Sequence, residues 1–347
     1  MPENLVTVCI PAYNSEKTIA ETLQSLVDQT YENIQIHVLD DVSTDRTREI
    51  VKSFDKVRLH VNPKNIGGEP NIKKCRYIGC GKYRAIYHAD DVYEPDMIER
   101  AVEVLEHSRN IGAVLTGAKI INVNGKEIGR SKTFSQLGLP DEYFYRFDLL
   151  TLLKLILRRD NFLFCPSVMA RSEVIEAIDA VPGADLNLDE NDVADVDLWF
   201  RIAKNHGLGL INKPLMRYRR SNQQITHRLH TVRTFRSDIF KTLDYWMNEP
   251  EVKKQLSRAD WGWYGEQIRR DDLQCSGKAL IQGDKVLSKK LLKKSRSMKS
   301  FYYGVQSKTG IKFLLLLFVV QLANFPGLDF LFKPLLQKIL VNRLVKK

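Results

Sequence analysis

Short apolar runs alternate with segments of helical period through the first third of the chain, and this alternation limits the fold more than any other feature. Apolar residues recur at helical spacing between the runs, for example at Ile19, Leu23 and Leu26. The pattern predicts an α/β fold with right-handed crossovers, in which a mostly parallel sheet carries helices on both faces. The runs that are predicted to be strands comprise residues 6–11, 34–39, 57–61, 84–88 and 112–121.

Further elements are predicted from about residue 148 onward. Residues 162–170 and 209–220 have the composition of strands, and residues 194–207 form an amphipathic helix that ends at a glycine. Trp199 falls on the apolar face of that helix, so we expect it to pack in the core. Earlier in the chain, the pair Asn124-Gly125 favours a tight hairpin turn.

Polar clusters directly follow four of the predicted strands. In a doubly wound sheet, ligands bind outside the carboxyl ends of the strands. Four unrelated surface loops would not be expected to gather polar residues at this position, so the sequence predicts a ligand site there. The clusters are residues 11–14, 40–45, 62–68 and 90–91.

The last cluster, Asp90-Asp91, sets two like charges side by side. Such a pair either moves into solvent, because the charges repel, or binds a hard cation, because Mg²⁺ and Mn²⁺ favour carboxylate oxygens. The other three clusters favour a cation site.

Positive charge is concentrated at one end of the 347-residue chain. The net charge is +11, but residues 278–347 hold fifteen Lys and Arg against two Asp, and residues 1–277 carry a net −2. A basic segment beside apolar runs favours an anionic membrane surface, and no motif supports a nucleic-acid partner. Five scattered cysteines and an N-terminus without a signal-peptide pattern lead us to expect a cytoplasmic, reducing location.

Taken in order, several segments resemble family 2 glycosyltransferases of the GT-A fold, which are inverting and use nucleotide sugars. The resemblance covers roughly residues 4–226, about two-thirds of the chain. Its segments are "VTVCIPAYNSEKTIAETLQSLVDQTYENIQIHVLDDVSTDRT", "NIGGEPNIKKC", "GKYRAIYHADDVYEPDM", "CPSVMARSEVI", "ADVDLWFRIA" and "YRRSNQQIT".

The resemblance implies a site for the nucleotide at the first two strand ends. Pro11, Tyr13 and Asn14 are expected to contact the base, and Asp41 is expected to accept the N–H of a uracil or thymine. Asp40 either takes part or caps the turn that follows it.

The same resemblance implies that Asp90 and Asp91 form the metal motif. One contacts the ribose or a metal-bound water, and the other holds the divalent cation, Mn²⁺ or Mg²⁺, that stabilises the departing nucleoside diphosphate. The family pattern is D-x-D-D, and His88 replaces its first aspartate here. His88 is either a packed residue at the strand end or a ligand.

Asp195 occupies the position of the family's general base in its E-D-x-D-L-W motif. An inverting displacement needs one carboxylate to take the proton of the acceptor hydroxyl. Ala194 replaces the preceding glutamate of the motif. Asp197 is the rival base, although its place on the helix favours a supporting role, and a carboxylate at residue 195 also suits a helix N-terminus without any catalytic role.

The segment "YRRSNQQIT" resembles the family's Y-R-x-H-x-x-Q loop. By that analogy Arg219 or Arg220 meets the diphosphate, whereas Tyr218 is structural. Ser221 stands where the family commonly has histidine.

The remainder of the chain is predicted to be helical and basic. We expect a GT-A domain at residues 1–226, a helical extension at 227–284 and a basic amphipathic tail at 285–347. The tail either lies peripherally on the cytoplasmic face of a membrane or packs on its own domain.

The leading hypothesis is transfer of a sugar, with inversion, from a UDP-linked donor to a glycan acceptor, expected to be lipid-linked, in cell-surface polysaccharide synthesis. Two alternatives are transfer to a polyprenyl phosphate, which needs no base, and a noncatalytic module that binds nucleotide sugars or glycans. A dehydrogenase is disfavoured because no G-x-G-x-x-G follows the first strand.

Overall fold

The computed structural model describes residues 4–180, 194–221, 232–297, 308–325 and 327–342. The chain divides into two compact units, Met1–Arg220 and Ser221–Lys347, and each is described by itself. The predicted boundary at residue 226 and residues 222–226 of the predicted loop lie outside the described residues, as do Pro326 and parts of the tail. The three-region division of the chain stays a prediction.

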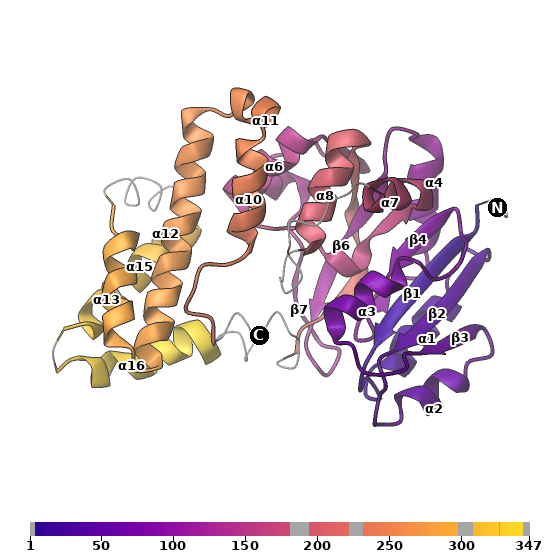
Figure 1. Ribbon diagram of the computed structural model, residues 1–347, viewed down its shortest axis with the longest axis horizontal. Coiled ribbons are helices and arrows are strands. Elements are labelled where there is room, and N and C mark those ends of the chain that lie inside the picture. Colours follow the sequence, from indigo (N-terminus) through magenta and orange to yellow (C-terminus); the bar gives the residue numbers. More distant parts are fainter. Residues whose placement is uncertain (1–3, 181–193, 222–231, 298–307, 326, 343–347) are drawn as a thin grey trace. The chain divides into compact units, whose positions relative to one another are not determined.

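Strands and helices alternate along the first unit (Figure 1). Its strands are β1 (Val6–Ala12), β2 (Ile34–Asp40), β3 (Val57–Val61), β4 (Tyr83–Ile86), β5 (Val92–Tyr93), β6 (Ala113–Ile121), β7 (Glu127–Arg130), β8 (Phe144–Phe147), β9 (Met169–Arg171) and β10 (Leu208–Arg219). Its helices are α1 (Ile19–Val27), α2 (Thr47–Lys52), α3 (Gly68–Cys75), α4 (Met97–His107), α5 (Phe134–Leu137), α6 (Leu149–Arg159), α7 (Ser172–Asp179) and α8 (Ala194–Asn205).

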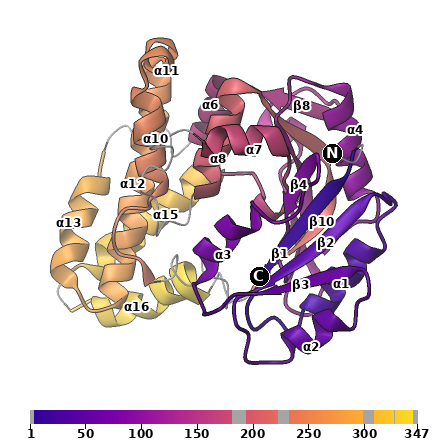
Figure 2. The same ribbon diagram turned by 45° about the vertical axis from the view of Figure 1, so that its right-hand side comes forward.

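All ten strands form one sheet in the order β3-β2-β1-β4-β9-β6-β10-β5, with β7 paired to β6 and β8 to β10. The pairs β2–β3, β1–β2, β1–β4 and β6–β10 are parallel, whereas β9 runs antiparallel between β4 and β6. Figure 2 shows β3, β2, β1 and β4 side by side. The predicted α/β fold with a mostly parallel sheet is confirmed.

Side chains of β1 alternate between the two faces of the sheet, as expected for a strand. Val6, Val8 and Ile10 are fully buried in the main core, together with apolar residues of α1 and α4. Cys9 points the other way and packs in a small cluster with Leu39 and Cys75, the last residue of α3. Helices therefore cover both faces, which explains why β1 is mostly apolar and buried along nearly all of its length.

The predicted strand at residues 162–170 is wrong. A short 3₁₀ turn occupies Cys165–Ser167, and only Met169–Arg171 form a strand. Pro166 has no N–H to donate to a neighbouring strand. In place of a backbone hydrogen bond between strands, the hydroxyl of Ser167 accepts the N–H of Thr116 at 3.1 Å. The apolar composition indicated that this segment is buried, but it did not determine whether its backbone is extended.

The second unit is helical. Leu273 and Leu280 of α12 are buried against apolar residues of the helices that follow, so residues beyond 285 share a core with the helical extension. Among the described residues, no helix combines the length and the apolar character needed to span a bilayer. The helices are α10 (Ile239–Asn248), α11 (Pro250–Gln255), α12 (Arg258–Ile281), α13 (Lys285–Ser295), α15 (Lys308–Ala323) and α16 (Asp329–Gln337).

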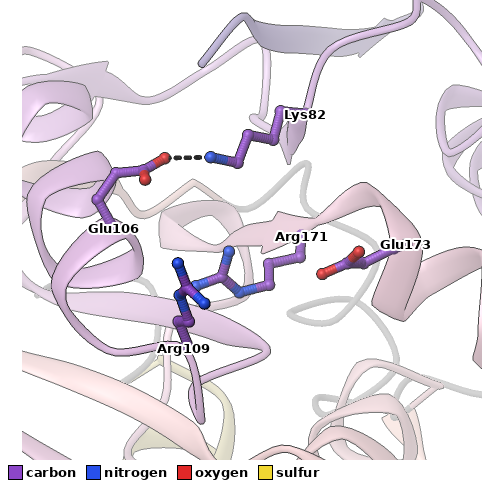
Figure 3. Close-up of a pocket in the computed structure, with 5 residues that line it drawn as sticks. All are labelled: Lys82, Glu106, Arg109, Arg171 and Glu173. Atoms are coloured by element: carbon purple, nitrogen blue, oxygen red, sulfur yellow. Dashed lines mark hydrogen bonds and ion pairs between the residues drawn. The ribbon is translucent and has the colours of Figure 1, made fainter. Parts of the chain in front are cut away.

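A charged pocket of about 320 Å³ lies at the amino end of β4, and Figure 3 shows its lining residues. The ammonium of Lys82 pairs with Glu106 at 2.6 Å. The guanidinium of Arg171 donates to the backbone carbonyls of Leu105 and Ile111. Because parallel strands present their ligands at the carboxyl end, this pocket is at the wrong end of the sheet to be the predicted site.

Candidate active site

The carboxyl ends of β1, β2, β3 and β4 lie in register, which brings the predicted clusters to one edge. The N–H of Asp41 donates to the carbonyl of Ala12 at 2.8 Å, and that of Asn62 to the carbonyl of Asp40 at 2.9 Å. The chain passes from β1 outward to β2 and β3 and then returns to β4 on the other side of β1. This reversal creates a topological switch point between β1 and β4, where open α/β sheets bind ligands.

The residues after β1 are held in a tight connection with the loop after β2. Asn14 adopts a left-handed backbone with φ of 50°, which asparagine tolerates better than most residues. Its side-chain oxygen accepts the N–H of Thr44 at 2.8 Å, and its own N–H donates to Ser43 Oγ at 2.9 Å. Pro11 is half-buried, whereas Tyr13 is 51% exposed. Tyr13 can therefore stack on a bound ring, whereas Asn14 shapes the backbone.

Asp41 is buried, and its carboxylate organises the segment after β3. Oδ1 accepts the N–H of Ile66 and the side-chain amide of Asn62, both at 2.9 Å, and Oδ2 accepts the N–H of Gly67 at 2.8 Å. The structure places Asp41 at the predicted edge of the sheet, but this carboxylate also fixes the entrance to α3. Sequence reasoning did not anticipate that second task.

Asp40 caps the turn that follows it, as one of the two readings of the sequence proposed. Its Oδ2 accepts the N–H of Ser43 at 2.9 Å. Within that turn Val42 has a φ of 63°, a backbone conformation that β-branched residues rarely adopt. Strain of this kind persists only where neighbouring contacts fix the backbone, and it gathers at functional sites.

Asp90, Asp91 and His88 converge after β4. One ligand atom from each lies within 4.8 Å of the others. Asp91 is fully buried, and its Oδ1 accepts the N–H of Arg219 at 2.7 Å. Asp91 Oδ2 and His88 Nε2 are buried without a hydrogen-bond partner among the described residues. Two orphaned buried ligand atoms fit a divalent cation, because buried polar groups otherwise carry a desolvation cost.

The environment of this cluster shifts the pKa values of Asp91 and His88. Burial raises the pKa of Asp91 well above its usual range, the charge of Asp90 adds to the shift, and Arg219 opposes it. Burial lowers the pKa of His88, against the charge of Asp90. The imidazole is thus kept neutral, which is the form that binds metals.

Arg219 and Arg220 were the two alternatives for the residue that meets the diphosphate, and the structure gives them different surroundings. The Arg219 guanidinium is buried, donates to the carbonyls of Asp90 and Val123, and pairs with Glu21 of α1. The Arg219 side chain therefore holds the backbone of Asp90 in position. Arg220 is half-buried at the end of β10, where its N–H donates to the carbonyl of Ile121 at 2.8 Å.

Asp195 lies in the first turn of α8, close to Cys165 and Glu69. The N–H of Val196 donates to Asp195 Oδ1 at 2.8 Å. Burial raises the pKa of Asp195 to about 6; the negative charge of Glu69 also raises it, whereas the Val196 N–H and the Cys165 thiol lower it. A carboxylate with this pKa is ionised at neutral pH and is a stronger base than an ordinary aspartate.

Asp197, the rival base, is 5% exposed and holds an ion pair with Arg201. The Arg201 Nε to Asp197 Oδ2 distance is 2.6 Å, one helical turn along α8. This partner explains the supporting role that the helical spacing indicated. Trp199 is 2% exposed, which confirms its place in the core.

Tyr218 connects the cluster of His88, Asp90 and Asp91 with the surroundings of Asp195. Its ring meets that of Phe164 edge-on, with centroids 5.3 Å apart. Burial raises its pKa; Asp91 and Asp90 add to the shift, Arg220 opposes it, and Cys165 raises it further. Glu69, Cys165 and Glu21 were not predicted as site residues. All three lie in segments that carry the family resemblance, and Glu69 also directly follows the polar run after β3.

The site combines a switch point lined by carboxylates, a cluster suited to a cation and a separate basic carboxylate, an arrangement that suits a transferase acting on a nucleotide-linked donor. Residues 7–178 match the family model of Glycosyl transferase family 2. The chain belongs to that family through this segment and is thus a glycosyltransferase, built on the α/β sheet described above.

Curated relatives agree with this class. An uncharacterized glycosyltransferase of Methanocaldococcus jannaschii is 28% identical over 232 residues, covering 64% of this chain and 73% of the relative. The putative teichuronic acid biosynthesis glycosyltransferase TuaG of Bacillus subtilis is 29% identical, covering 36% of this chain and 51% of the relative. WfgD of Escherichia coli, a UDP-Glc:alpha-D-GlcNAc-diphosphoundecaprenol beta-1,3-glucosyltransferase, is 29% identical, covering 40% and 56%. The chain thus spans little more than half of the two bacterial relatives.

Proposed function

We propose that this protein transfers a sugar from a UDP-linked donor to a hydroxyl group of a lipid-linked glycan, with inversion at the anomeric carbon, in cell-surface polysaccharide synthesis. The observation that carries the proposal is the fully buried Asp91, which clusters with Asp90 and His88 at the switch point and whose Oδ2 has no hydrogen-bond partner among the described residues. A nucleoside diphosphate and its cation suit that position, because together they offset the repulsion of the two carboxylates.

The donor is proposed to lie across the ends of β1, β2 and β4. In this arrangement the nucleotide base is flanked by Pro11, Tyr13 and Asn14. Asp41 accepts the N–H of the base, and Asp90 lies near the ribose. Of the two arginines, Arg220 is assigned to the diphosphate, because the Arg219 guanidinium already holds the carbonyls of the cluster and Glu21. A divalent cation bound by Asp90 and Asp91 supplies charge stabilisation for the departing diphosphate.

Asp195 is proposed as the general base. Its carboxylate takes the proton of the acceptor hydroxyl while that oxygen bonds to the anomeric carbon, and the bond to the diphosphate oxygen breaks on the opposite face. The pKa of about 6 supports this role, because the group is ionised at pH 7 yet basic enough to accept a proton. The ion pair of Asp197 with Arg201 supports Asp195 over its neighbour.

A lipid-linked acceptor is proposed partly from WfgD, whose name specifies a diphosphoundecaprenol acceptor. A base at Asp195 favours a hydroxyl over a polyprenyl phosphate, because a phosphate is already ionised and needs no base.

We expect UDP-sugars to bind this protein at least tenfold more tightly with Mn²⁺ than in excess chelator, because the carboxylate cluster repels a bare diphosphate. Calorimetry with a panel of UDP-, GDP- and CMP-sugars measures this, with the non-uridine donors as controls. Transfer is then followed as release of UDP with a diphosphoundecaprenol-linked sugar as acceptor.

Three outcomes of this screen would contradict the proposal. Failure of every nucleotide sugar to bind removes the donor site. Tight binding without UDP release, with any acceptor, favours a noncatalytic module. Transfer to undecaprenyl phosphate alone identifies the other enzymatic alternative.

We also propose that the second unit attaches to an anionic membrane surface through α15 and α16. Phe313, Leu316 and Val320 of α15 face the core of the unit. Leu315 and Phe318 face away from that core and are 62% and 61% exposed. A helix that is apolar on both faces needs a second apolar environment. On α16, Phe330 and Leu331 are exposed as well.

The charge of the region favours lipid as the environment for this face. Residues 278–347 carry a net +13, and each Lys or Arg near an anionic bilayer contributes about 1 kcal/mol to binding. A second copy of the chain would bring like charge to like charge instead. Charge and apolar burial then act together, so high salt should release the protein only partly.

Replacing Leu315 and Phe318 together by glutamate should weaken binding to vesicles of anionic lipid at least tenfold, since both side chains lose their apolar contact. Co-sedimentation measures the change. Removing all residues beyond 285 would be a poorer test, because it exposes Leu273 and Leu280 of α12. The matched control is Val286→Glu on α13, whose side chain is 82% exposed.

Vesicle binding that stays unchanged in the double variant would refute the lipid-facing assignment. A dimer that dissociates in that variant, without any change in vesicle binding, would assign the face to a second copy of the chain.

A further inference from the structure

His88 lies where the chain departs from its family, and the structure directs it toward the carboxylates. Its ligating nitrogen belongs to the same cluster as the carboxylate oxygens of Asp90 and Asp91, with the three atoms within 4.8 Å of one another. His88 Nε2 is buried and, among the described residues, has no hydrogen-bond partner. Asp91 Oδ2 is likewise buried without a hydrogen-bond partner among the described residues, and the whole Asp91 residue is buried.

Contacts on the far side of the cluster hold these ligands in position. The backbone N–H of Arg219 donates to Asp91 Oδ1 at 2.7 Å, whereas Oδ2 has no hydrogen-bond partner among the described residues. The backbone N–H of His88 donates to the hydroxyl of Tyr93 at 2.9 Å, and Tyr93 itself stacks on Tyr87 with ring centroids 4.3 Å apart. The first contact orients the Asp91 carboxylate, as second partners of metal ligands do, and the second fixes the backbone from which His88 projects.

A packed residue at a strand end would not leave its ring nitrogen in this position. Buried imidazole nitrogens are normally hydrogen-bonded, since an unpaired one is destabilising. Ligand atoms bound to one ion at about 2.1 Å lie no more than about 4.2 Å apart, so a bound cation would draw the three atoms closer together.

We propose that His88 is a metal ligand together with Asp90 and Asp91, and that its nitrogen shifts the preference of the site from Mg²⁺ toward Mn²⁺ and Co²⁺. This rests on the proposed nucleotide-sugar function. Mg²⁺ demands oxygen ligands and loses its waters reluctantly. Imidazole ligands favour transition ions, and the affinity of such ions rises from Mn²⁺ to Co²⁺. The family's aspartate at this position would supply oxygen and a further negative charge instead.

The test uses the full chain with Mn²⁺, in the presence and absence of UDP. Electron spin-echo spectroscopy of bound Mn²⁺ detects a directly coordinated imidazole as modulation from ¹⁴N. The modulation should be present in the native protein and absent in His88→Asp, which still binds Mn²⁺. His107→Asn, which changes an exposed histidine at the end of α4, is the matched control and should retain the modulation.

Calorimetry gives a second readout. The ratio of the Mg²⁺ to the Mn²⁺ dissociation constant should fall at least tenfold in His88→Asp, and Co²⁺ should bind the native protein more tightly than Mn²⁺. Bound Mn²⁺ without ¹⁴N modulation, an unchanged ratio in His88→Asp, or no Mn²⁺ binding under either condition would overturn the inference.

These outcomes separate this inference from the proposed function. Transfer of sugar from a UDP donor without ¹⁴N modulation refutes the role of His88 and leaves the function standing. A modulated Mn²⁺ signal in a protein that transfers no sugar supports the role of His88 and refutes the proposed function.

Discussion

Asp195→Asn lowers turnover by about two to four orders of magnitude while donor binding stays near its native level, the usual scale for losing a general base. The amide keeps the size of the side chain and can still accept the Val196 N–H that now bonds Oδ1 at 2.8 Å. It cannot take a proton from the acceptor. Steady-state UDP release and calorimetric donor binding separate these two effects.

The pH dependence of the native enzyme supplies an independent readout of the same group. Because the pKa of Asp195 is raised to about 6, the carboxylate is ionised above that pH and protonated below it. Turnover should therefore fall as the pH is lowered through about 6, and the residual turnover of Asp195→Asn should lack that step. If Asp195→Asn turns over normally and Asp197→Asn is inactive, the general base is Asp197 instead.

Asp91→Asn abolishes transfer and weakens the binding of UDP-sugars in Mn²⁺. Its oxygen can still accept the N–H of Arg219, so the backbone contact of 2.7 Å is preserved. The negative charge and the buried oxygen assigned to the cation are lost. Calorimetry of UDP-sugar binding with and without Mn²⁺, together with UDP release, measures both losses.

Asp55→Asn serves as the control for Asp91→Asn, because Asp55 is an exposed aspartate in the connection before β3. Circular dichroism of both variants establishes that they fold. Full activity of the native protein in excess chelator would be incompatible with a cation at Asp91.

Much of the fold and the location of the site followed from the sequence because both depend on local patterns. The strands near residues 6, 34, 57, 84 and 113 begin within about one residue of the predicted positions. Their polar ends meet because parallel strands share an edge. The segment at residues 162–170 failed because apolar composition records burial, whereas Pro166 decides the backbone.

Long-range partners could not be predicted in the same way. Arg219 pairs with Glu21, which is 198 residues away in sequence, and Asp41 holds the N–H groups of Ile66 and Gly67. Neither spacing nor composition indicates such contacts, because each depends on how separate strands are brought together. The same is true of Cys165 beside Asp195, since a thiol in a short turn carries no catalytic pattern.

The contacts of Asp41 also bear on how this protein can change during evolution. Its carboxylate holds Ile66 and Gly67, and α3 begins directly after them, with Glu69 in its first turn acting on the pKa of Asp195. A substitution at Asp41 would therefore alter both the proposed contact with the nucleotide base and the surroundings of Asp195, the proposed general base, in a single mutational step. New donor preferences are reached at lower risk through Tyr13, whose exposed side chain can change size while the segment before α3 keeps its shape.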